Sequence, residues 1–131
     1  MQTIVLVMRR RSVAQGIAQK LREAQSLCVV LEPSHSRARA AICSRAADIA
    51  LIEVAEMGRH GLSECQGISE CLALCGSLRE EAPQCKLLLM CPEGDREAVA
   101  RAVEAKRQGQ VNDFVFYDAT TGYLVSKLLS M

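Results

Sequence analysis

The stretch that decides the fold is Ala47-Asp48-Ile49-Ala50-Leu51-Ile52-Glu53-Val54-Ala55, which continues through Glu56-Met57-Gly58-Arg59-His60 to Gly61. A short apolar run, Ile49 to Ile52, ends on the acidic residue Glu53, and a glycine follows eight positions later. In open α/β folds, ligands bind at the edge formed by the carboxyl ends of the strands. The stretch therefore predicts a strand that places the Glu53 carboxylate at this edge of a sheet.

Similar apolar runs recur along the chain, and most are nearly uninterrupted by polar residues. Strands of that kind are typical of a parallel sheet covered on both faces. The predicted strands are Thr3–Met8, Leu27–Leu31, Asp48–Val54, Lys86–Cys91 and Asp113–Tyr117.

Helical periodicity follows each predicted strand. Ser12-Val13-Ala14-Gln15 has the spacing of a capping box, a second helix is expected from Ser36, and Asp118 or Thr120 is expected to cap the last helix. Pro92-Glu93-Gly94-Asp95 separates the fourth strand from the next helix. Residues on the apolar faces are expected to be Val13, Ile17 and Leu21; Ala40, Ala41 and Cys43; Ile68, Cys71, Leu72, Cys75 and Leu78; Val99, Ala102 and Val103; and Tyr123, Leu124, Leu128 and Leu129. Strict alternation of strands and helices predicts a doubly wound parallel α/β sheet.

Size and charge narrow the class of protein. The 131 residues suffice for one domain spanning residues 1–131, with an aliphatic core because only four side chains are aromatic. A net charge of +1 gives no reason to expect binding to nucleic acid or to a membrane surface. No apolar run approaches the roughly 20 residues of a membrane span, and the first charges follow the first apolar run, unlike a secretory signal. We therefore expect a cytoplasmic protein.

The chain has seven cysteines, at positions 28, 43, 65, 71, 75, 85 and 91. The number is odd and several fall within apolar strand or helix patterns. Both observations favour reduced cysteines that act as small core residues rather than a disulfide framework.

The order, number and length of these elements, together with the spacing from Glu53 to Gly61, resemble the bacterial response-regulator receiver domain (CheY-like) of two-component phosphorelays. The resemblance implies a five-stranded sheet with strand order 2-1-3-4-5. It also implies that Glu53 occupies the place of the aspartate that accepts a phosphoryl group in that family.

The residues expected to assist phosphorylation differ from the family pattern. The acidic pair that holds Mg²⁺ at the end of the first strand corresponds to Met8 and Arg9, and Mg²⁺ prefers oxygen ligands that these side chains lack. The fourth strand ends on Cys91, a weak hydrogen-bond donor, where the family carries threonine or serine.

The fifth strand departs from the pattern as well. The aromatic switch residue corresponds to Phe114, with Phe116 as the alternative, and Tyr117-Asp118 replaces the usual lysine and proline. The pattern indicates a degenerate pseudo-receiver that needs no metal or cofactor, works without phosphorylation and acts through protein–protein contacts.

Glu53 can still have a structural role. One of Arg9, Arg10 and Arg11 could take the place of the metal and hold Glu53 in a bidentate ion pair. The alternative is a solvated carboxylate beside an arginine run exposed to water.

The resemblance also implies a surface for dimerisation or partner docking on the fourth helix, fifth strand and fifth helix, roughly Glu97–Lys106 and Asp113–Leu129. Charged and apolar side chains mix there, as suits a symmetric homodimer held by salt bridges. The candidate interface residues are Arg101, Val103, Glu104, Lys106, Asp113, Tyr123 and Lys127.

Parts of the sequence also fit other functions. One is an atypical receiver that still accepts phosphate, and another is a small flavodoxin-like enzyme in which Cys91 acts with Arg96. A zinc site would use His60, Cys65, Cys71 and Cys75, although the last two also fit a buried helix stripe. For His35 the expectation is a surface position.

Overall fold

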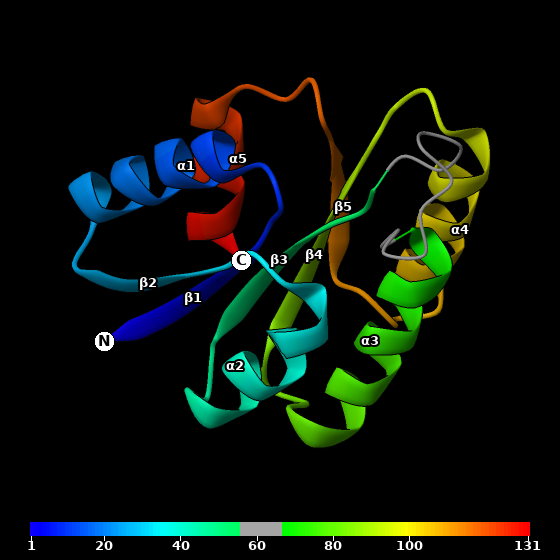
Figure 1. Cartoon of the computed structure of the whole chain (residues 1–131), viewed down its shortest axis with the longest axis horizontal. Coiled ribbons are helices and arrows are strands. Elements are labelled where there is room, and N and C mark those ends of the chain that lie inside the picture. The colour runs from blue at the N-terminus through cyan, green and yellow to red at the C-terminus, as the bar shows by residue number, and fades with distance from the viewer. Residues whose placement is uncertain (56–66) are drawn as a thin grey trace.

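The computed structural model describes residues 1–55 and 67–131, and the strands within them form one parallel sheet (Figure 1). The strand order is β2-β1-β3-β4-β5, as expected. The strands are β1 Gln2–Val7, β2 Leu27–Glu32, β3 Ile49–Glu53, β4 Lys86–Cys91 and β5 Asp113–Phe116. Every predicted strand is confirmed, with each boundary within one residue.

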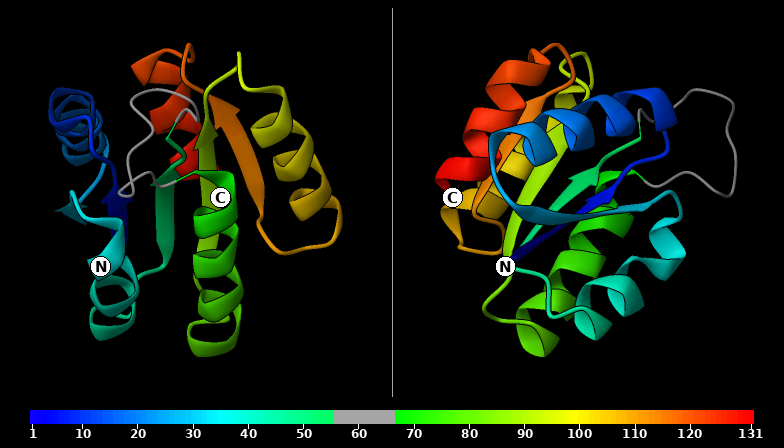
Figure 2. Two further views of the ribbon diagram at one scale, coloured as in Figure 1. Left: turned by 45° about the vertical axis from the view of Figure 1, so that its right-hand side comes forward. Right: turned by 90° about the vertical axis from the view of Figure 1, so that its left-hand side faces the viewer.

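Helices cover both faces of this sheet (Figure 2). Helices α1 and α5 pack on one face, while α2, α3 and α4 pack on the other. The helical segments are α1 Arg11–Ala24, the 3₁₀ turn η1 His35–Arg37, α2 Ala38–Ser44, α3 Ile68–Glu81, α4 Arg96–Arg107 and α5 Thr121–Ser130.

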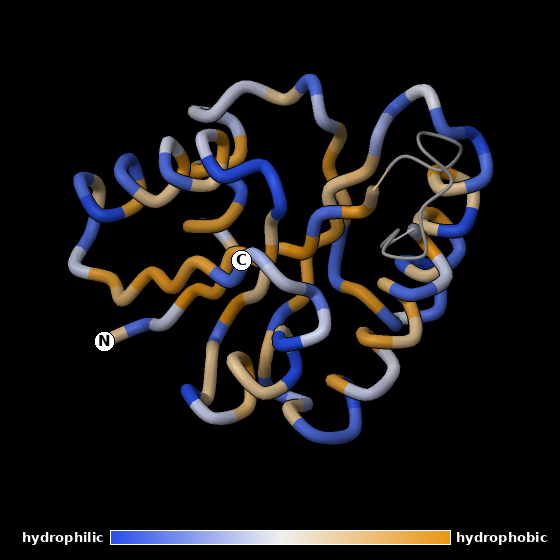
Figure 3. Tube along the Cα trace, in the orientation of Figure 1, coloured by the Kyte–Doolittle hydropathy of each residue, from blue (hydrophilic) through white to orange (hydrophobic). Residues whose placement is uncertain are grey.

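The central strand β3 shows why its residues form a strand. Ala50 and Ile52 face the core under α2, α3 and α4, whereas Ile49 and Leu51 face the core under α1 and α5. All four side chains are buried, and each large one contributes roughly 1.5–3 kcal/mol of hydrophobic free energy. The apolar strands accordingly run through the middle of the molecule (Figure 3).

The structure contradicts the expected start of α1 and decides between the two expected caps of α5. Helix α1 begins at Arg11 and its N-cap Arg10 makes no side-chain cap bond, so Ser12 lies inside the first turn and the predicted capping box is wrong. Thr120 rather than Asp118 caps α5, by accepting a hydrogen bond from the Tyr123 N–H at 3.1 Å. Asp95 caps α4 in the same way through the Ala98 N–H.

The expected buried faces of α2 and α4 are confirmed for Ala102 and in part for Cys43, but Ala40 and Val103 are exposed. Ala38 and Ile42 are the buried residues of α2, whereas Ala40 is exposed, because the tighter turn of η1 precedes the helix and shifts its face. In α4 the buried stripe consists of alanines at positions 98, 102 and 105. Val103 lies one position beyond that stripe and is exposed, as is Tyr123 on α5.

The expectation of core cysteines is confirmed for Cys71, Cys75, Cys85 and Cys91, which are buried, and the last three of them are free. Cys28 and Cys43 are half-buried and free, and Cys65 lies outside the described residues. Among residues 1–55 and 67–131, none of the helices combines the length and apolarity that a bilayer span needs.

Candidate functional site

Glu53 ends the central strand at the carboxyl edge of the sheet, and only 3% of it is exposed. The Arg9 backbone N–H donates to its Oε1 atom at 2.8 Å. The Arg10 Nε–H donates to Oε2 and forms an ion pair with the carboxylate. Both carboxylate oxygens are therefore bound by the segment that joins β1 to α1.

Arg10 is held in place by more than its ion pair. Its guanidinium carbon lies 4.0 Å from the centroid of the Tyr117 ring, a cation–π distance. Its Nη2 lies 3.5 Å from the Met90 Sδ on β4. The arginine thus joins β1, β3, β4 and the end of β5, and its planar group suits the paired and stacked geometry.

Tyr117 fixes the backbone that leaves β3. Its hydroxyl donates to the Val54 carbonyl, and its own N–H donates to the Cys91 carbonyl at 3.0 Å. Burial, with the nearby Glu53 charge, raises the pKa of Tyr117, so the hydroxyl remains a donor at neutral pH.

His35 is buried at this site, so its expected surface position was wrong. It is 8% exposed, and its Nε2–H donates to the Glu53 carbonyl at 2.6 Å. Burial lowers the pKa of His35 even though the Glu53 carbonyl and charge favour the imidazolium. Its Nδ1 is buried and has no hydrogen-bond partner among the residues that the structure describes, which fits a neutral ring.

Sequence spacing gave no signal for this histidine. His35 follows β2, and β1 separates β2 from β3 in the sheet. The contact with Glu53 is therefore made over a neighbouring strand by the η1 turn. Cys71 of α3 also donates, more weakly, to the Glu53 carbonyl, with its Sγ at 3.7 Å.

The structure separates the three candidate arginines. The pairing of an arginine with Glu53 is confirmed for Arg10, although it is made through Nε alone and is not bidentate. The alternative of a solvated Glu53 is wrong. Arg9 contributes its backbone N–H while its side chain is exposed. Arg11 lines a cavity together with Met8, which is buried among residues of α1 and α5.

Cys91 does not have the environment of a nucleophile. It is fully buried in the core under α2, α3 and α4, and burial raises the pKa of its thiol to about 12. A catalytic cysteine needs an accessible thiolate with a lowered pKa. The alternative of an enzyme dependent on Cys91 therefore lacks its nucleophile in this structure.

The neighbouring aromatic residues differ in burial. Phe114 is half-buried against the core under α2, α3 and α4, whereas Phe116 is exposed. The two rings are arranged edge to face, with their centroids 5.7 Å apart.

The described residues at this edge do not fit Mg²⁺, the metal that the receiver resemblance implies. Mg²⁺ requires several oxygen ligands. Here the Glu53 oxygens are already bound and a guanidinium lies against them. No group of three or more His, Cys, Asp or Glu side chains able to hold a metal occurs among residues 1–55 and 67–131.

On the surface formed by α4, β5 and α5, the charged side chains bind each other. Asp113 accepts from Lys106, with Nζ 2.9 Å from Oδ1, and from Lys127 on its other oxygen. Glu104 binds Arg107 of its own helix and Gln108, which follows the helix.

The remaining expected interface residues are placed as follows. Arg101 donates to the Ser69 hydroxyl of α3. Val103, Phe116 and Tyr123 are the large apolar or aromatic side chains exposed on this surface of the described chain.

Comparison with protein-family profiles gives no match, and neither does comparison with curated protein sequences. Solved structures do match. An orphan response regulator of H. pylori has a TM-score of 0.76 and 13% identity, over 98% of this chain and 94% of that chain. A response regulator of Thermotoga maritima has a TM-score of 0.73 and 18% identity, over 99% of this chain and 96% of that chain.

A CheY-like receiver domain protein of Methanospirillum hungatei JF-1 has a TM-score of 0.74 and 14% identity, over 99% of this chain and 92% of that chain. This chain therefore has the receiver fold of response regulators, a five-stranded parallel α/β sheet of order 2-1-3-4-5. At these identities the likeness concerns the fold.

Proposed function

We propose that this chain is a receiver-like signal-transduction domain, spanning residues 1–131, that acts without phosphorylation and through protein–protein contacts. The observation that carries the proposal is the state of Glu53, the residue in the phosphoacceptor position of the family pattern. Its carboxylate is buried, and Arg10 and the Arg9 N–H bind both oxygens.

The chemistry of this arrangement supports the proposal. A carboxylate must present a free oxygen to attack a phosphorus atom, and the metal must neutralise the charge that develops. Arg10 supplies a fixed positive charge where the family uses a metal, and Met8 and Arg9 replace the acidic pair. Glu53 therefore anchors a permanently set conformation.

The first experiment is an intact-mass measurement after incubation with Mg²⁺ and acetyl phosphate under reducing conditions. The expected result is no added phosphoryl mass in the protein or in its Arg10→Ala variant. A phosphorylated Glu53 would overturn the proposal and establish an atypical phosphoacceptor. An adduct on Cys91 would overturn it in favour of an enzyme.

Partner contact is proposed for the surface of α4, β5 and α5. Lys106, Asp113 and Lys127 already bind one another within the chain, so the contact rests on Val103, Phe116 and Tyr123. This differs from a dimer held mainly by salt bridges between protomers. A second copy of the chain or a protein partner with an apolar surface suits these side chains.

Sedimentation tests this surface. Self-association at high micromolar concentration is expected to weaken in a Phe116→Ser, Tyr123→Ser double variant and to persist in Ser130→Ala, a change at an exposed position at the end of α5. A monomer at all concentrations would contradict homodimerisation. The proposal includes a cytoplasmic location, supported by the free cysteines, and no nucleic acid contact through this domain.

A further inference from the structure

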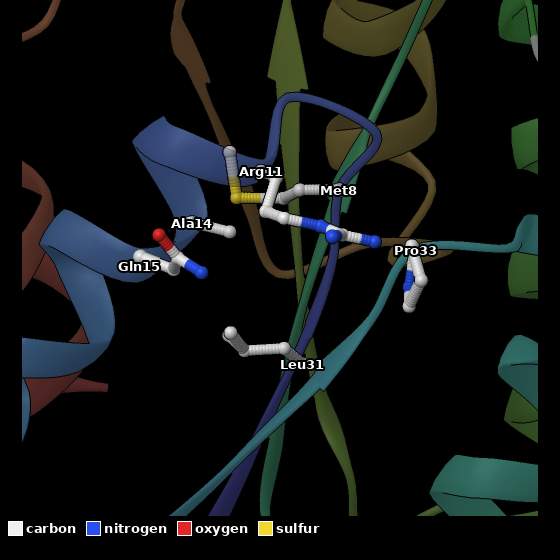
Figure 4. A pocket seen from close by; sticks show the side chains of 6 residues that line it. All are labelled: Met8, Arg11, Ala14, Gln15, Leu31 and Pro33. Atoms are coloured by element: carbon white, nitrogen blue, oxygen red, sulfur yellow. The ribbon is translucent and has the colours of Figure 1, made fainter.

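A cavity of about 230 Å³ lies beside the β1–α1 segment (Figure 4). Its walls come from the residue that follows β1, from the first turns of α1 and from the end of β2. The lining residues are Met8, Arg11, Ala14, Gln15, Leu31 and Pro33. A water molecule takes up about 30 Å³ in the liquid, so this volume corresponds to roughly eight waters or a ligand of about ten heavy atoms.

The lining is chemically divided. Four of its six side chains are apolar, and the other two, Arg11 and Gln15, come from the same helix at i and i+4. Figure 4 shows the Arg11 side chain extending from α1 toward Pro33, with Leu31 and Gln15 on other sides of the cavity. A ligand here would meet one cation, one amide and otherwise apolar walls.

The charge of Arg11 is not neutralised within the part of the chain that the structure describes. Its guanidinium makes none of the ion pairs found there, and the first turn of α1 contains no acidic residue. The nearest acidic residue along β2, Glu32, accepts a hydrogen bond from the Ser34 N–H at 3.0 Å. Arg10, the neighbouring cation, is paired with Glu53.

We propose that this cavity binds a small amphipathic carboxylate, with its anionic group on Arg11 and Gln15 and its apolar part against the remaining walls. A guanidinium binds a carboxylate through two parallel hydrogen bonds, and a single arginine matches a single negative charge. The apolar lining favours a short hydrocarbon or aromatic ring over a fully hydrophilic anion.

The location links the cavity to Glu53. Met8 and Arg11 line the cavity, whereas the Arg9 N–H and the Arg10 guanidinium, which lie between them in sequence, bind Glu53. A ligand in the cavity therefore contacts the same segment that holds the carboxylate. A regulatory effect of the ligand on the domain rests on the proposed function. Binding of the ligand in the cavity does not.

The test is a titration of the ¹⁵N-labelled full chain, followed by amide chemical shifts, with hexanoate and benzoate and with the neutral hexanamide and benzamide. Ligands of this size are expected to bind with a Kd on the order of 1 mM. The carboxylates should cause saturable shifts at Met8, Arg11, Ala14, Gln15 and Leu31, and the amides should bind about tenfold more weakly.

Three variants make the test specific. Arg11→Gln removes the cation, and Gln15→Glu places a carboxylate one helical turn from Arg11, so both should abolish the preference for carboxylates. Arg45→Gln changes an exposed arginine that follows α2 and should leave binding intact. All are exposed positions, so the folded spectrum should persist.

Absence of saturable shifts with every probe would overturn the proposal. So would carboxylate binding that survives Arg11→Gln and Gln15→Glu, or saturable shifts confined to other residues. The readout involves neither phosphate nor Glu53, so its failure is distinct from failure of the acetyl phosphate experiment. Additional shifts at Arg9 and Arg10 would support the regulatory role.

Discussion

Arg10 and Glu53 form an ion pair across the carboxyl edge of the sheet, although 43 positions separate them in the chain. The two ends of the pair differ in exposure, with 4% of the Glu53 side chain and 38% of the Arg10 side chain accessible to water. Arg10 also rests on the Tyr117 ring, so one interaction connects the β1–α1 segment with β3 and the end of β5.

Removing the Arg10 side chain should destabilise the protein. It leaves a buried carboxylate without its cation, at a cost of about 2–3 kcal/mol after allowance for the exposed face of Arg10. Urea denaturation of Arg10→Ala measures this cost. Arg9→Ala is the matched control and should lie within about 0.5 kcal/mol of the parent protein, because Arg9 contributes its backbone N–H. Equal stability of the two variants would contradict the role given to Arg10.

The Tyr117 hydroxyl should contribute separately from its ring. Tyr117→Phe keeps the ring under Arg10 and loses the hydrogen bond to the Val54 carbonyl, so we expect a loss of about 1 kcal/mol. Tyr123→Phe removes a hydroxyl from an exposed side chain and should change stability little. Thermal or urea denaturation compares the stability of the two variants. Equal stability of Tyr117→Phe and Tyr123→Phe would argue against the hydrogen bond.

Burial of neutral His35 should make stability fall on acidification. Its folded-state pKa lies below the unfolded value of about 6.5, so the unfolded chain binds the proton first and stability declines as pH falls through that value. Denaturation between about pH 7.5 and pH 5 should show this slope. The slope should flatten in His35→Gln and persist in His60→Gln, the other histidine of the chain. If the slope is unchanged in His35→Gln, the pH dependence of stability comes from another group.

Asp113 should stabilise the junction of α4, β5 and α5. Desolvation alone would raise its pKa, but hydrogen bonds from Lys127 and Lys106 outweigh it and hold the pKa below the usual value. Its contribution is therefore present above the unfolded pKa of about 3.9 and is lost as pH falls through the lower folded value. At neutral pH, Asp113→Asn should cost about 1 kcal/mol in urea denaturation, and the exposed Asp118→Asn much less. A cost unchanged at pH 2–3 would contradict an ionic origin.

Cys91 should resist alkylation in the folded protein. Its buried thiol, with a pKa of about 12, presents almost no thiolate at neutral pH. Iodoacetamide followed by peptide mass mapping should leave Cys91 unmodified in native protein and modify it in urea. Rapid native modification would restore the enzyme hypothesis.

Much of the fold could be predicted because local patterns and chain connectivity determine it. The apolar runs ending in Glu53 and Cys91 fix two strands, and the helical periods between runs require crossovers that keep the strands parallel. The errors came where neighbouring structure overrides a local signal. Ser12 has good spacing for a cap, yet the chain turns into α1 at Arg10, whose side chain binds Glu53 instead.

The sequence by itself determined the sheet, its order through the receiver resemblance, the position of Glu53 at the sheet edge and the presence of nearby arginines. Only the tertiary structure decided which arginine pairs with Glu53, that His35 is buried beneath it, and that Arg11 lines a separate cavity. Hydrophobic periodicity records which face of a strand or helix is buried, because burial repeats with the geometry of the element. Pairing between side chains on segments far apart in sequence depends on how loops and strand ends meet. The local periodicity of the sequence carries no information on such pairing.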